Sequence, residues 1–199
     1  WDAETGDESF AISIELPNRA EDIVYSPDGL KITAAAFSAT TLFQSHARDG
    51  TLVAEPGETT SAGLALAYSH DGQVIATGHR NGDVYLWDAS THELSGSPLQ
   101  HPGPAQGLAF SPDGAMLAVT CGDWTTRIWD VKSGEALGRV LRHRGFPDDV
   151  AFSPDGRYLA VAADSDTVRL WEVHTDERLL VSHAVGGLAR RAAVDPTGR

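Results

Sequence analysis

Three consecutive residues, Ser69, His70 and Asp71, have the side chains that a hydrolase uses as nucleophile, general base and orienting acid. In such enzymes the three side chains converge from separated positions of the chain. Here they are adjacent in sequence, and they are followed by Gly72, a residue that favours a tight turn. We therefore interpret this segment as a hairpin turn and predict that the chain has no catalytic residues and is not an enzyme.

The histidines and the cysteine do not indicate metal chemistry. No two histidines have the i, i+4 spacing of a helical zinc site; they stand at positions 46, 70, 79, 92, 101, 143, 174 and 183. Cys121 is the only cysteine, which excludes an intramolecular disulfide, and it ends an apolar segment, so we expect a buried and unreactive thiol. The sequence has no glycine-rich phosphate-binding loop. We predict neither a metal nor a cofactor.

The composition limits the partners of the chain. Its 199 residues carry 15 Lys and Arg against 28 Asp and Glu, a net charge of −13, and 41% of them are hydrophobic, enough for a buried core. The acidity argues against binding to nucleic acid or to an anionic membrane. It either keeps the protein soluble or forms an acidic rim for a basic partner. No apolar segment reaches the roughly 20 residues of a membrane span, and we expect a cytoplasmic protein.

These residues stand in a pattern that repeats about every 42 residues. A Ser-Pro-Asp-Gly turn, or a close variant of it, ends at Gly29, Gly72, Gly114, Gly156 and Gly198. Trp-Asp or Trp-Glu pairs keep the same spacing and begin at Trp1, Trp87, Trp129 and Trp171, with Phe43 in the remaining slot. Two markers in phase over the whole chain establish an internal repeat.

Each repeat indicates four short β-strands. In the fourth repeat, an apolar segment at 148–152 enters the 153–156 turn, and the apolar segment 159–163 follows. A β-branched and aromatic segment at 167–172 and a more polar one at 178–181 complete the unit. Such a sheet needs a neighbour on each face, and radial repetition of sheets gives a β-propeller. Linear solenoids are the alternative, but their repeats are shorter, at about 20–30 residues.

The segment 150–172 closely resembles a WD-repeat (WD40) unit, and the resemblance extends over nearly the whole chain. It implies an all-β propeller of four-stranded antiparallel blades, with complete blades at 20–56, 63–98, 105–141 and 148–182. Partial strands are expected at 10–16 and 188–194. Because both ends fall within a repeat, we expect a piece of a longer ring or an open arc whose exposed blade faces favour self-association.

The resemblance also implies structural roles. In many WD repeats a histidine, an aspartate, a hydroxyl and a tryptophan form a hydrogen-bonded network. In the third blade His101, Asp123 and Trp129 match it, and in the fourth His143 and Trp171 do. The second blade has Trp87 but no matching histidine. The two later blades are therefore expected to be the more rigid.

The loops before the first strand and between the second and third strands are where the family generally binds partners. Projected onto this chain, they give five candidate binding residues: Trp124, Arg80, His79, Arg144 and Phe146. Trp124 is the only tryptophan that departs from the 42-residue spacing, and it either anchors a partner or folds back over a neighbouring blade. Phe146 either binds or packs.

Three functions are compatible with this pattern. The first is a non-catalytic scaffold that binds protein or peptide partners. The second is the sensor portion of a larger bacterial signalling protein with an NTPase or protein-kinase domain. The third, a hydrolase or lyase acting in the central channel, is disfavoured because innermost segments such as 108–110 and 150–152 offer almost no ionisable groups.

Overall fold

The computed structural model describes residues 19–36, 42–54, 59, 61–163, 167–173 and 178–184. Four antiparallel sheets, here called blades 1 to 4, make up this part of the chain, and strand order within each sheet follows the sequence. Blade 1 contains β1 (Ala20–Tyr25), β2 (Lys31–Ala36), β3 (Leu42–His46) and β4 (Leu52–Ala54). Blade 2 contains β5 (Gly63–Tyr68), β6 (Val74–His79), β7 (Asp83–Asp88) and β8 (Leu99–Gln100). Blade 3 contains β9 (Ala105–Phe110), β10 (Met116–Cys121), β11 (Thr125–Asp130) and β12 (Ala136–Arg142). Blade 4 contains β13 (Pro147–Phe152), β14 (Tyr158–Ala163), β15 (Thr167–Glu172) and β16 (Arg178–Ala184).

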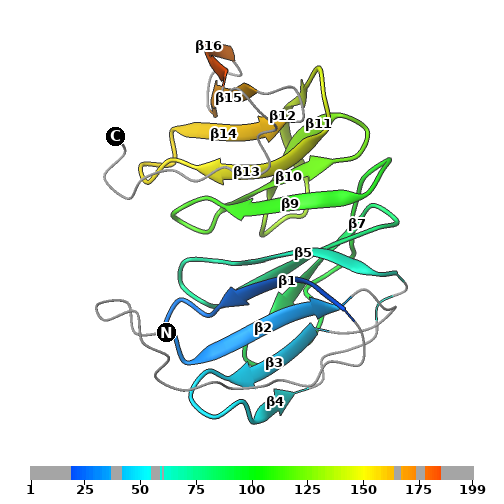
Figure 1. The fold of residues 1–199 in the computed structure, drawn as a ribbon, viewed down its shortest axis with the longest axis vertical. Helices are drawn as coiled ribbons and strands as arrows, with labels where there is room; N and C mark the ends of the chain where they lie inside the picture. Colours follow the sequence, from blue (N-terminus) through cyan, green and yellow to red (C-terminus); the bar gives the residue numbers. More distant parts are fainter. Residues whose placement is uncertain are drawn as a thin grey trace.

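The four blades are arranged as an arc. Figure 1 shows the first strands β1, β5, β9 and β13 side by side, with β4 and β16 at opposite ends of the molecule. The predicted all-β fold of four-stranded antiparallel blades in an incomplete ring is confirmed. The partial strands predicted at 10–16 and 188–194 lie outside the described residues.

The hairpin turn after each first strand is closed by a serine and an aspartate. In blade 2 the Ser69 hydroxyl donates to Asp71 Oδ1 at 2.6 Å and accepts from the Val74 amide at 2.9 Å. The turns at Ser26, Ser111 and Ser153 repeat this geometry. The hydrogen bond from Ser69 lowers the pKa of the Asp71 carboxyl. Ser69 is thus bonded to Asp71 and not to His70, whose side chain is exposed.

The hydrophobic core is divided among the interfaces between neighbouring blades. Between blades 1 and 2, Ala35 clusters with Leu66, Ile75 and Trp87. Larger clusters join blade 2 to blade 3 around Val84, Leu108 and Leu117, and blade 3 to blade 4 around Ile128, Val150 and Leu159. Blades 2 and 3 bury both of their faces in this way, so each depends on its two neighbours for stability.

A polar network joins blade 1 to blade 2 next to the apolar cluster. The Tyr68 hydroxyl lies 2.8 Å from Thr33 Oγ1 and accepts a hydrogen bond from Gln44 Nε2 at 2.6 Å. Gln44 Oε1 lies 2.8 Å from His92 Nε2, and Gln44 itself is 1% exposed. Burial raises the pKa of Tyr68, so its hydroxyl stays protonated and available to the network.

Replacing Tyr68 by phenylalanine is expected to lower the free energy of unfolding by about 1–2 kcal/mol, because the buried Gln44 amide and Thr33 hydroxyl lose their shared partner. Phenylalanine fits sterically, since Phe110 and Phe152 occupy the corresponding positions at the ends of the first strands of blades 3 and 4. Urea denaturation measures the change. Tyr25→Phe is the control, because Tyr25 has the same place in blade 1 but is 65% exposed. Equal stability of the two variants would contradict the prediction.

Candidate functional site

In blade 2, the tryptophan of the third strand is tied to a histidine through a hydroxyl. Trp87 Nε1 donates to Thr77 Oγ1 at 3.0 Å, and Thr77 Oγ1 lies 2.9 Å from His79 Nε2. His79 Nδ1 must donate to the Ser61 carbonyl, 2.8 Å away, because that oxygen only accepts. His79 Nε2 is therefore the unprotonated acceptor, and the imidazole is held in one neutral tautomer.

The structure places His79 inside the blade and not on the loop surface where the sequence predicted it. His79 was expected on the loop surface, but its side chain is 3% exposed and its pKa is lowered by burial. It also supplies the histidine that the second blade lacked by sequence, from the end of β6 instead of from the loop before β5. The signal is the Thr-x-His pattern, since residues two apart on a strand lie on one face.

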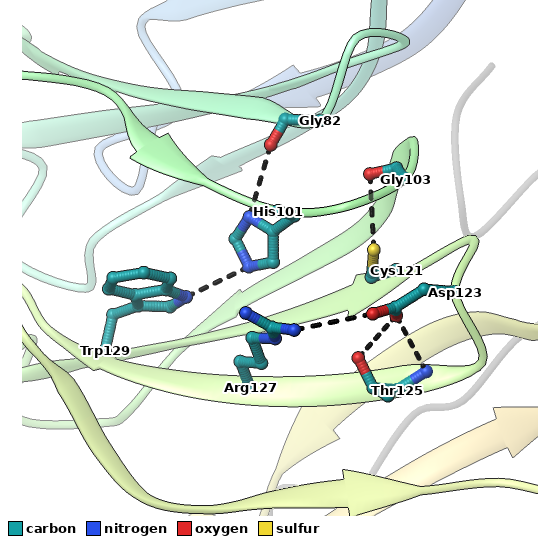
Figure 2. Close-up of polar contacts among 8 residues, drawn as sticks. All are labelled: Gly82, His101, Gly103, Cys121, Asp123, Thr125, Arg127 and Trp129. Carbon is teal, nitrogen blue, oxygen red and sulfur yellow. Dashed lines mark hydrogen bonds and ion pairs between the residues drawn. The ribbon is translucent and has the colours of Figure 1, made fainter.

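Blade 3 uses a histidine from the loop before its first strand. Trp129 Nε1 donates to His101 Nε2 at 3.0 Å, which leaves His101 Nδ1 to donate to the Gly82 carbonyl at 3.3 Å. Figure 2 shows how His101 lies between Trp129 and Gly82. Burial lowers the pKa of His101, and the nearby Arg127 lowers it further. His101 and Trp129 are thus directly bonded and cross the boundary between blades 2 and 3.

Asp123, expected in the same network, lies apart from His101. Its Oδ1 accepts from the Thr125 hydroxyl and amide, and its Oδ2 lies 3.4 Å from Arg127 (Figure 2). Burial opposes ionisation of Asp123, but its hydrogen bonds and Arg127 lower its pKa overall. Cys121 is buried and donates to the Gly103 carbonyl, and burial raises the pKa of its thiol. Asp123 therefore stabilises the turn between β10 and β11.

In blade 4, His143 and Trp171 are close but not hydrogen-bonded to each other. Their rings meet edge to face with centroids 6.1 Å apart, and His143 Nε2 lies 2.8 Å from Thr126 Oγ1 of blade 3. His143 Nδ1 and Trp171 Nε1 are buried without a partner among the described residues. Burial and the charge of Arg169 lower the pKa of His143 to about 4.

In blade 1, the tryptophan slot is filled by Ser45 and not by Phe43. Ser45 pairs with Ile32 across the sheet, as Trp87 pairs with Ile75 in blade 2. The expectation for Phe43 was wrong because the connection between β2 and β3 is one residue longer than its counterpart in blade 2.

Backbone hydrogen bonds link successive loops at the end of the blades that carries these histidines. The His101 amide donates to the Gly82 carbonyl at 3.0 Å, and the Gly122 amide donates to the Pro104 carbonyl at 2.8 Å. The His143 amide donates to the Trp124 carbonyl at 2.9 Å. We define the upper loop surface as the exposed Arg80, Trp124 and Arg144 together with the partly exposed Phe146. Phe146 lies beside the turn that holds Trp124, close to Gly122.

Trp124 combines exposure with an unfavourable backbone conformation. Its side chain is 54% exposed and its φ is +66°, in the left-handed region that bulky residues rarely adopt. The equivalent residue of the turn in blade 2 is Gly82, with φ +91°. The geometry of this turn favours glycine, so the tryptophan in blade 3 is held there at a cost of about 1–2 kcal/mol.

Comparison with protein families decides the identity of the fold. The family model described as "WD domain, G-beta repeat" matches residues 56–88, 93–130 and 136–172, more than half of the chain. The chain belongs to the WD40 family. WD40 repeats generally form scaffolds for protein interactions.

A solved structure extends the comparison to three dimensions. The WD40 chain is similar to the structure titled "Structure of U3-55K", with a TM-score of 0.75 and 20% sequence identity. The match covers 83% of this chain and 52% of that one, so the chain spans about half the length of U3-55K. At this identity the likeness shows a shared fold. No curated protein matches the sequence. Among the described residues, none forms a helix long and apolar enough to cross a membrane.

The first strands of the WD40 blades border a cavity of about 550 Å³. Four carboxylates line it, those of Glu21, Asp22, Asp148 and Asp149. The sequence did not predict an acidic cavity, because these residues come just before the apolar segments of β1 and β13 and not within them. Asp22 uses Oδ1 to accept from the Ile23 amide and Oδ2 to accept from the Leu66 amide, so it joins β1 to β5. Asp22 therefore acts as a structural link between blades.

Proposed function

We propose that this WD40 chain is a non-catalytic scaffold that binds a protein or peptide partner through the upper loop surface. Trp124 carries the proposal. An exposed tryptophan held in a conformation that favours glycine lowers stability, and such strain is typical of functional sites. Tryptophan and arginine are also the side chains most enriched among residues that dominate binding energy. The linked loops present Trp124 on a rigid support.

The proposal assigns no catalysis to the chain. Ser69 and Asp71 close a hairpin turn, and His79, His101 and His143 are buried within or between blades. The described residues that line the central cavity offer carboxylates but no histidine, cysteine, serine or lysine. Groups of three or more histidine, cysteine, aspartate or glutamate side chains that could hold a metal are absent from the described residues.

Replacing Trp124 by glycine tests the binding surface. Partner binding is expected to weaken by about 10- to 100-fold, while the free energy of unfolding is unchanged or higher by about 1 kcal/mol. Proteins captured from a cell extract by the two forms are compared by quantitative mass spectrometry, and stability is measured by urea denaturation.

The matched control for that experiment is Leu30→Gly. It also removes an exposed apolar side chain, 65% exposed, but from the turn between β1 and β2 at the opposite end of the blades. Equal capture by the wild-type and Trp124→Gly proteins would overturn the proposed site.

Self-association and a cytoplasmic location are further parts of the proposal. Ile23 and Tyr25 on β1 are 60% and 65% exposed, whereas Leu108 and Phe110, their equivalents in blade 3, are buried by the preceding blade. This open apolar face supports association of two copies, which light scattering after size-exclusion chromatography would detect as a doubled mass.

A further inference from the structure

Two segments that meet at Trp124 have a net charge opposite in sign to that of the whole chain. The segments 122–127 and 139–146, which meet at the hydrogen bond between the His143 amide and the Trp124 carbonyl, contain one carboxylate and four guanidinium groups. The carboxylate is Asp123, and the arginines are Arg127, Arg139, Arg142 and Arg144. The whole chain has a net charge of −13.

The only carboxylate in these segments is already engaged. Asp123 accepts hydrogen bonds from Thr125 and pairs with Arg127 at 3.4 Å. Arg142 and Arg144 form no ion pair with any residue that the structure describes. Both side chains are exposed, and they alternate with the buried Leu141 and His143, so they project outward on either side of the contact to Trp124.

Apolar surface lies next to these two cations. Trp124 is 54% exposed and Val140, two residues before Arg142, is 41% exposed. A partner that covers this area gains from burying an apolar side chain against Trp124 and from placing carboxylates against Arg142 and Arg144. A basic partner, which the overall charge of the chain would attract, meets like charges here.

We infer that the upper loop surface, together with the neighbouring Arg142, binds an acidic peptide segment in which an apolar or aromatic side chain stands beside two or more carboxylates. The inference rests on the proposed function and specifies the chemistry of the partner. Guanidinium groups suit carboxylates because they donate paired hydrogen bonds in one plane. The apolar side chain packs on the indole of Trp124.

A random dodecapeptide library displayed on phage provides the test. It is panned in parallel on the wild-type chain, on Trp124→Gly and on the double variant Arg142→Glu/Arg144→Glu. The control is the double variant Arg48→Glu/Lys132→Glu, which makes the same charge change at exposed positions in the turns between the third and fourth strands of blades 1 and 3. Circular dichroism confirms that each variant is folded.

The wild-type chain and the Arg48→Glu/Lys132→Glu control are expected to enrich peptides rich in Asp and Glu around an apolar residue. Neither Trp124→Gly nor Arg142→Glu/Arg144→Glu is expected to enrich these peptides. Affinities of synthetic copies of these peptides, measured by fluorescence anisotropy, should fall at least tenfold between 0.05 and 0.5 M salt. Enrichment of neutral or basic peptides that depend on Trp124 would overturn the inference and leave the proposed function intact. Recovery of no peptide that depends on Trp124 would overturn both.

Discussion

Gly82→Ala is expected to lower the free energy of unfolding by about 3 kcal/mol. A Cβ at Gly82 would stand 2.2 Å from the His101 carbonyl oxygen and 2.8 Å from that of Gly103, both backbone atoms that cannot rotate away. The φ of +91° adds about 1–2 kcal/mol for any residue with a side chain. Relief of the contact requires the loop at 101–103 to move, and overpacking of this kind costs about 1–3 kcal/mol.

The same change should also disturb blade 3. The Gly82 carbonyl accepts from both the amide and the Nδ1 of His101, which in turn accepts from Trp129. Urea denaturation gives the loss of stability, and tryptophan fluorescence reports the displacement of Trp129. Gly29→Ala is the matched control: its φ is +70°, but a Cβ there meets nothing within 4 Å, so only about 1–2 kcal/mol is expected. Equal losses of unfolding free energy for the two variants would show that the loop at His101 moves away from the added Cβ at little cost, which would contradict the prediction.

Acidification from pH 7 to pH 4 is expected to lower the free energy of unfolding by several kcal/mol. His79, His101 and His143 are each at most 7% exposed, and burial lowers the pKa of all three. Protonation of Nε2 in His79 or His101 would also remove the acceptor that Thr77 or Trp129 requires. His143, whose pKa falls to about 4, accounts for about 3 kcal/mol of the loss.

The sign of this effect follows from which state binds protons. An unfolded histidine titrates near pH 6.5, and the folded ones bind protons only at lower pH. Stability is therefore complete above pH 6.5 and falls as the pH drops toward 4. The turn aspartates act in a lower window, because the pKa values of Asp28, Asp71 and Asp155 are lowered from an ordinary value of 3.8 by their serine partners.

His143→Gln isolates the largest contribution. Glutamine can still hydrogen-bond to Thr126 but does not titrate, so the loss between pH 6.5 and 4 should shrink by about 3 kcal/mol. Urea denaturation at half-unit steps of pH measures the slope. His70→Gln is the control, because it makes the same substitution at an exposed position in a turn. A slope unaffected by His143→Gln would mean that folding does not lower the pKa of this histidine, which would contradict the prediction.

The strands and turns of each blade could be predicted because their determinants are local. The serine and the aspartate of the 69–72 turn bond to atoms within five residues, and the glycine adopts a positive φ of +70°. Spacing alone misplaced the tryptophan slot of blade 1. One additional residue between β2 and β3 moves Ser45 into it, and no aromatic residue marks the position.

The candidate site was harder to predict because its contacts join distant segments. The departure of Trp124 from the repeat was visible in the sequence, and glycine at the equivalent position 82 is the only hint of its left-handed backbone. The burial of His79 depends on the Ser61 carbonyl, 18 residues earlier. The alternation of Arg142 and Arg144 with buried neighbours depends on how the end of blade 3 packs against blade 4.

The different histidine–tryptophan arrangements of blades 2 and 3 affect how such repeats can be exchanged by recombination. Blade 2 carries Thr77, His79 and Trp87 within its own two middle strands, so a transplanted copy would bring these three side chains with it. Blade 3 takes His101 from the segment that precedes it and anchors that histidine on Gly82 of blade 2. A crossover placed between His101 and β9 would separate Trp129 from its acceptor, whereas one placed before His101 would keep the pair together. The usable module boundaries of this gene therefore differ from one repeat to the next.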